Sequence, residues 1–79
     1  MKIKIPLADM NNGETGIVAE LLGGSGLANR LIALGIRPGI NVKKISASFF
    51  YGPVVIQTGN NQTALGHGIS YKIIIEVER

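Results

Sequence analysis

One stretch, LANRLIALGIRPGINVKKI over residues 27–45, constrains the fold most, because it combines a helical pattern, a sharp stop and the start of a strand. Its leucines recur at i, i+4 and i+7, which places them on one face of a predicted helix over Ser25–Leu34. The predicted apolar face comprises Leu27, Ala28, Leu31, Ile32 and Leu34. This pattern predicts one short helix that packs against the rest of the domain through its leucines.

The residue types at both ends of this helix predict where it starts and stops. Ser25 is the predicted N-cap, because its hydroxyl can accept a hydrogen bond from a free backbone N–H. Gly35 is the predicted stop, because glycine takes the left-handed conformation without a Cβ clash. Leu31 and Ile36 would then be the apolar pair that accompanies a Schellman ending. Pro38-Gly39 follows as a predicted turn, with proline at its second and glycine at its third position.

Glycine-marked turns divide the rest of the chain into short segments that read as strands. The predicted strands are Lys2–Ile5, Glu14–Leu22, Asn41–Phe49, Val54–Thr58, Gln62–Leu65 and Tyr71–Val77, of which Gln62–Leu65 is a short strand or a bend. Leu7–Met10 is predicted as a single helical turn, and Gly66-His67-Gly68 as a break. Five or six short strands with one inserted helix favour a mainly β fold, a small barrel or sandwich.

Alternation along the strands predicts which side chains face inward. The predicted inward residues of the two clearest strands are Ile45, Ala47, Phe49, Ile73, Ile75 and Val77. Lys44 falls in the opposite, outward phase. Val42 does not fit this phase, so either it packs on a second face or a β-bulge shifts the register between Val42 and Ile45.

Composition limits the function classes. Seventy-nine residues predict a single domain over residues 1–79, and the absence of cysteine excludes disulfides and thiolate metal sites. The longest apolar runs are far shorter than the roughly 20 residues of a membrane-spanning helix, so a cytoplasmic protein without membrane insertion is expected. With His67 as the one histidine and Asp9 as the one aspartate, we expect neither an enzyme nor a metal or cofactor site.

Three patterns together resemble the FeoA family: LxDMxxGExGIVxxxxGG, RLxxLGIRPGxxV and GPVVIxTGxxxxALGxGIxxxIIIEVE. The resemblance extends from Leu7 to Glu78 and is most specific from Arg30 to Gly39. It implies an SH3-like β-barrel and a non-enzymatic accessory of bacterial ferrous iron transport. The implied partner is a large membrane iron transporter with a cytosolic G domain. Gly66 and His67 stand where the family often has basic residues, so a basic contact from that loop is not expected.

The candidate partner-binding residues are two aromatics and two arginines. Phe50 and Tyr51 follow Phe49 in a hairpin, and adjacent strand side chains cannot all enter one core, so they are either an exposed docking tip or packed locally against Pro53. Arg30 and Arg37 flank the helix stop, where they either complement the helix dipole or contact an acidic surface of the transporter.

The resemblance also leaves open an SH3-like regulatory module related to metal-dependent repressors. Two other functions remain open from the residues. The formal charge is +3, with acidic residues interspersed. A nucleic-acid surface would draw on a stripe formed by Lys2, Lys4, Lys43, Lys44 and Lys72. Self-assembly into a homo-oligomer would use exposed sheet edges and aromatics. The small charge excess and the lack of a nucleic-acid motif favour protein binding over nucleic-acid binding, and the oligomeric state stays open.

Overall fold

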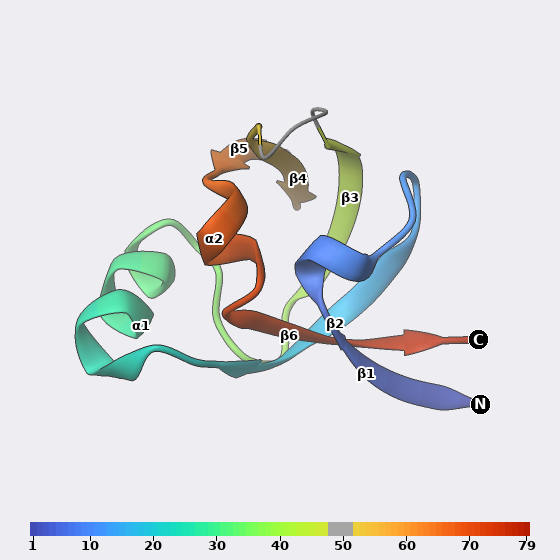
Figure 1. Cartoon of the computed structure of the whole chain (residues 1–79), viewed down its shortest axis with the longest axis horizontal. Helices are drawn as coiled ribbons and strands as arrows, with labels where there is room; N and C mark the ends of the chain where they lie inside the picture. Colours follow the sequence, from blue (N-terminus) through green and yellow to red (C-terminus); the bar gives the residue numbers. More distant parts are fainter. Residues whose placement is uncertain (48–51) are drawn as a thin grey trace.

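The fold is described by a computed structural model covering residues 1–47 and 52–79, shown in Figure 1. The elements run, in order, β1 (Lys2–Pro6), the 3₁₀ turn η1 (Leu7–Asp9), β2 (Thr15–Leu21), α1 (Gly24–Ala33), β3 (Asn41–Ala47), β4 (Val54–Thr58), β5 (Asn61–Leu65), α2 (His67–Ser70) and β6 (Ile73–Glu78). The fold is mainly β with one inserted helix, as the sequence predicts.

All six strands belong to one antiparallel sheet in the order β1-β6-β2-β3-β4-β5. The last strand, β6, lies between β1 and β2, and its Ile75 pairs with Ile5 of β1 and with Val18 of β2. The sheet curls, and η1 and α2, which follow the two edge strands, pack against each other. The two edge strands are therefore β1 and β5, at opposite ends of the strand order.

The concave side of the sheet holds the apolar core, which α1 and η1 help to cover. Ile73, Ile75 and Val77 are at most 2% exposed, which confirms the predicted phase of the last strand. The other buried apolar residues are Leu7, Met10, Val18, Leu31, Ile36, Val42, Val54, Ile56 and Leu65. Every strand except β1 contributes at least one of these residues, so the core depends on the whole sheet.

The predicted end of α1 is confirmed in detail. Gly35 has φ +85°, and its N–H donates to the carbonyl of Ile32 at 2.9 Å. The N–H of Ile36 donates to the carbonyl of Leu31, also at 2.9 Å, and both side chains are buried. These two bonds define a Schellman ending. The Pro38-Gly39 turn is also present, with Ile40 N–H donating to the Arg37 carbonyl at 3.3 Å.

The predicted start and face of α1 are partly wrong. The residue before the helix is Gly23, with φ +90°, and no side chain caps the helix, so Ser25 lies inside the first turn. Leu31 is buried and Leu27 packs against the core, whereas Leu34 and Ile32 are 52% and 44% exposed. The helix ends at Ala33, so Leu34 leaves the helical path and turns away from the core.

The predicted inward phase of β3 is also wrong. Val42 and Lys44 are buried, while Ala47 is exposed and Ile45 only half-buried. The register with β4 shifts between Lys44 and Ser46, so the bulge lies at Ile45, later than the sequence suggested. Before the bulge, Val42 shares the core face, and no second face is needed to explain it. Phe49, the third residue of the predicted phase, lies outside the described residues.

A second helix appears where the sequence predicted only a break. α2 is a single turn from His67 to Ser70, and the Ser70 N–H donates to the Gly66 carbonyl at 3.1 Å. His67 and Tyr71 stack edge to face on it, with ring centroids 5.1 Å apart. Within residues 1–47 and 52–79, neither helix has the length and apolar content needed to cross a bilayer.

Candidate docking surface

Acidic and basic residues are distributed unevenly along this chain. All five acidic residues lie in two short segments: Asp9, Glu14, Glu20, Glu76 and Glu78. Residues 21–75 hold none, so the acidic residues are clustered and not interspersed along the chain. This acid-free segment forms α1, β3, β4, β5 and α2. Figure 1 places α1 at one side of the molecule and both chain ends at the other.

At the side of the chain ends, the charges are engaged with one another. Arg79 donates to both carboxylate oxygens of Glu14, from Nε at 3.0 Å and from Nη2 at 2.8 Å. The Asn11 N–H also donates to Glu14, at 3.0 Å, and closes the turn before β2. These bonds to Arg79 and to the Asn11 backbone lower the pKa of Glu14 to about 2. Glu78 accepts from the ammonium of Met1 at 2.9 Å.

Lys44 is the buried member of this charged group. It is 3% exposed, and its Nζ donates to the carbonyls of Ala8 at 2.9 Å and Met10 at 2.7 Å. Those carbonyls belong to η1 and its C-cap, so the lysine satisfies acceptors that the short turn leaves free. Burial lowers the pKa of Lys44, while the nearby carboxylates of Asp9 and Glu14 act in the opposite direction. Lys44 is therefore structural, and it is not part of a surface lysine stripe.

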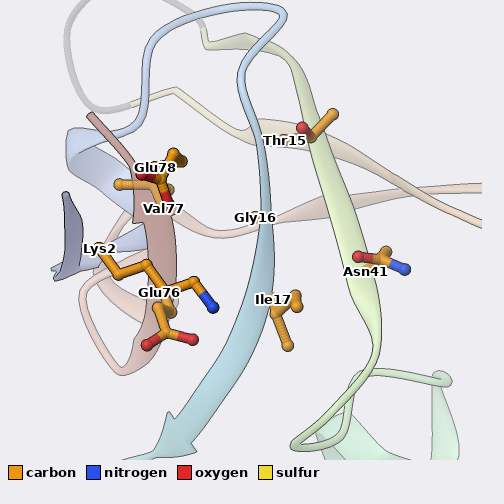
Figure 2. A pocket seen from close by; sticks show the side chains of 8 residues that line it. All are labelled: Lys2, Thr15, Gly16, Ile17, Asn41, Glu76, Val77 and Glu78. Carbon is orange, nitrogen blue, oxygen red and sulfur yellow. The ribbon is translucent and has the colours of Figure 1, made fainter.

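A groove lined in part by charged side chains crosses the outer face of β6 and β2 (Figure 2). Its volume is about 220 Å³, and Gly16 forms the floor between the side chains of Glu76 and Asn41. A Cβ at Gly16 would meet the side chain of Ile75 and lie 2.7 Å from the carbonyl oxygen of Glu76. Glycine at this position therefore permits β2 and β6 to lie close together.

The predicted arginines lie at the opposite side. Arg30 is in the last turn of α1, and Arg37 is in the loop between Gly35 and the Pro38-Gly39 turn. Both are exposed, and the guanidinium group of neither forms a hydrogen bond or an ion pair with another described residue. The exposed side chains of Ile32 and Leu34 lie between them in the chain. The arginines are thus free cations beside exposed apolar groups.

The loop that carries Arg37 also forms one wall of a surface hollow of about 500 Å³. The lining residues are Leu34, Gly35, Gly39, Ile40, Asn41, Thr58, Gly59 and Asn61. One side of the hollow therefore comes from the end of α1 and its loop, and the other from the turn between β4 and β5. No acidic residue lines it, in contrast to the groove in Figure 2.

Phe50 and Tyr51, the other predicted docking residues, lie outside the described residues. Within the part of the chain that the structure describes, no group of three or more histidine, cysteine or carboxylate side chains could hold a metal ion. The arrangement offers binding chemistry: free guanidinium groups, exposed apolar side chains and an uncharged hollow. Residues 5–77 match the FeoA domain family.

The chain belongs to the FeoA domain family. A curated relative, a putative Fe(2+) transport protein A of Methanocaldococcus jannaschii, is 38% identical over 71 residues, which cover 90% of this chain and 84% of the relative. A crystal structure of an iron uptake regulatory protein (FeoA) is 28% identical and superimposes with a TM-score of 0.84, over 95% of this chain and 99% of that one. The SH3-like β fold and the sequence patterns are thus those of the FeoA family.

The fold also occurs within larger proteins. A manganese-dependent transcriptional repressor superimposes with a TM-score of 0.87 over 99% of this chain but only 44% of the repressor, at 16% identity. At that identity the likeness shows the fold alone. The FeoA family thus shares its architecture with a module of metal-dependent repressors.

Sequence reasoning missed two features of this surface. One is the acid-free segment, which is visible by marking the five acidic positions on the printed sequence. The other is the hollow, which joins residues from two separate turns and has no signal in the local pattern. The assignment of Arg30 and Arg37 to partner binding stays a prediction.

Proposed function

We propose that this FeoA-family chain is a non-enzymatic accessory of ferrous iron transport that docks on the cytosolic G-domain part of the iron transporter. The observation that carries the proposal is the pair of exposed guanidinium groups, Arg30 and Arg37, which pair with no described residue and lie in the acid-free segment 21–75 beside exposed apolar side chains. Family membership and the name of the M. jannaschii relative support the link to Fe(2+) transport.

The physical basis of the docking is charge complementarity around an apolar centre. Rim charges steer association and select partners, while apolar groups removed from water supply most of the affinity. Leu34 is 52% exposed and lines the hollow, and Arg37 lies on the loop that walls it. An acidic surface with one protruding apolar side chain would satisfy both features at once.

The test is a binding titration between the full chain and the purified cytosolic domain of the transporter. Replacing both arginines by glutamate (Arg30→Glu with Arg37→Glu) should weaken binding at least tenfold, because it places carboxylates opposite an acidic partner. The matched control makes the same charge change at the other side of the molecule, Lys2→Glu with Lys4→Glu, and should alter binding less than threefold, a difference of about 0.7 kcal/mol.

Two further arms decide the remaining contributions. Phe50→Ala and Tyr51→Ala test the aromatic residues that the sequence predicts as a docking tip, and retention equal to the native chain would remove them from the site. Binding should weaken as salt rises, because the rim charges are exposed. Lack of binding by the native chain, or equal loss in both double variants, would contradict docking through this surface.

A further inference from the structure

The two edges of the sheet differ in how they are protected. The β1 edge carries Lys2, Lys4 and Pro6, and charged residues and proline are the usual protection against pairing with another strand. The β5 edge, Asn61–Leu65, has neither charge nor proline. Only its last residue, Leu65, is buried, and α2 begins two residues later. The open part of the edge therefore extends from Asn61 to Ala64.

The register of the β4–β5 hairpin identifies which backbone groups face outward. Thr58 pairs with Asn61 across a two-residue turn, and Gly59 has φ +59°, as in the tight turns that favour this hairpin. In an antiparallel pair, alternate residues direct their N–H and C=O groups away from the partner strand. Counting from the turn, the outward residues are Gln62 and Ala64, and both are exposed. No hydrogen bond joins the backbone of either residue to another described segment on that outer side.

We infer that this open edge of β5 receives an extended acidic segment of a partner protein as an added strand. Main-chain hydrogen bonds to Gln62 and Ala64 would hold the segment, as in other cases of strand addition. The inference rests on the proposed docking and deepens it, because it names the shape and chemistry of what the partner presents. The hollow lined by Leu34 and Ile40 adjoins the edge at Asn61 and gives one apolar side chain of the segment a place.

Charge selects this occupant over a second copy of the chain. Arg37 lies on the loop that walls the hollow, and the β5 edge belongs to the acid-free segment. Pairing β5 with β5 of a second copy would bring two acid-free surfaces together, with no carboxylate to offset the arginines. An acidic segment of another protein supplies that carboxylate, so the partner is expected to be acidic and extended.

The test follows amide hydrogen exchange of the full chain by NMR, with and without the cytosolic domain of the transporter. Binding of the segment should slow amide hydrogen exchange at Gln62 and Ala64 by about tenfold or more, because their outward N–H groups become hydrogen-bonded. Ala64→Pro removes one outward donor without removing a bond to β4, and should reduce binding at least tenfold. Ala64→Ser is the matched control and should bind as the native chain does, with β4 amides protected in both variants.

Each outcome decides one of the two proposals. If the domain binds but these amides exchange as before, or Ala64→Pro binds normally, the edge inference is overturned while the docking stands. If the native chain does not bind the domain, the docking on the transporter is overturned. A short peptide of alternating glutamate and valine then decides the edge: protection of Gln62 and Ala64 by this peptide, but not by its lysine counterpart, supports it, and no protection overturns it.

The same experiment detects a second copy as the occupant. Light scattering on the free chain should give the mass of a monomer, because the β5 edges of two copies would not be complementary in charge. A dimer that Ala64→Pro converts into monomers would overturn the inference, since it would show that β5 of another copy already occupies the edge.

Discussion

The side of the molecule where the chain ends meet and the side of α1 use their charges in opposite ways. Near the chain ends, Arg79 bonds to the carboxylate of Glu14, which ties the last residue of the chain to the turn before β2. The amine of Lys44 bonds to the C-cap of η1. Near α1, the guanidinium groups of Arg30 and Arg37 bond to no described residue, and apolar side chains beside them stay exposed. The charges at the first side stabilise the fold, whereas those at the second side are available to bind a partner.

This difference shows that a small formal charge can hide an uneven distribution of acidic and basic residues along the chain. The excess is +3, yet residues 21–75 contain five lysines and arginines and no acid. In a domain of this size the core is modest, so charges engaged in the fold matter for stability. Charges that contribute nothing to the fold are the better guide to the binding surface.

The largest expected effect tests the leucines of α1 against each other. Leu31→Ala should destabilise the domain by about 3 kcal/mol, because it leaves a cavity beneath the Schellman ending. Leu34→Ala should change stability by less than about 0.5 kcal/mol, because the side chain is already half in water. Urea unfolding of the two variants measures both values. Similar losses would mean that Leu34 packs in the core after all.

The next effect concerns the buried amine near the chain ends. Lys44→Ala should cost about 2 to 3 kcal/mol, because it removes the donor to two carbonyls and the packing of a buried side chain. Its neighbour Lys43 is exposed, so Lys43→Ala is the matched control and should cost less than about 0.5 kcal/mol. Equal costs in urea unfolding would refute a structural role for Lys44.

A smaller effect should appear in acid. The pKa of Glu14 is about 2 in the folded chain, below its usual value of 4.5, so the carboxylate contributes stability that is present above pH 4.5 and lost as pH falls toward 2. Glu14→Gln should therefore lower the thermal midpoint by a few degrees at pH 7 and reduce its fall between pH 4.5 and 2. Melting curves at several pH values measure this, with Glu76→Gln as the comparison. An unchanged slope below pH 4.5 would show that Glu14 does not set it.

The smallest effect on stability is expected at the side of α1. Replacing Arg30 and Arg37 together by glutamine should alter the unfolding free energy by less than about 0.5 kcal/mol, because neither guanidinium bonds to the described part of the domain. The same variant should lose affinity for the transporter's cytosolic domain. A clear loss of stability would instead indicate that the arginines serve the fold, and the contrast between the two sides would fail.

The sequence by itself determined the local structure of this protein. Gly35 and the Leu31/Ile36 pair specified the helix ending, because a left-handed residue and two apolar neighbours leave the backbone few alternatives. Turn residues and alternation also located the six strands within a few residues, and the inward face of β6 followed from its period of two. Such features depend on neighbours in the chain, which the sequence displays directly.

Only the tertiary structure decided where Lys44 points, because its amine bonds carbonyls 34 and 36 residues away and a bulge at Ile45 resets the phase of β3. It also decided which leucines of α1 the core covers, because Leu31 is buried while Leu34 is 52% exposed. The hollow and the unprotected β5 edge arise in the same way, from segments distant in sequence that the curled sheet brings together. Local sequence patterns do not predict such contacts, because the contacts depend on how distant segments pack against one another.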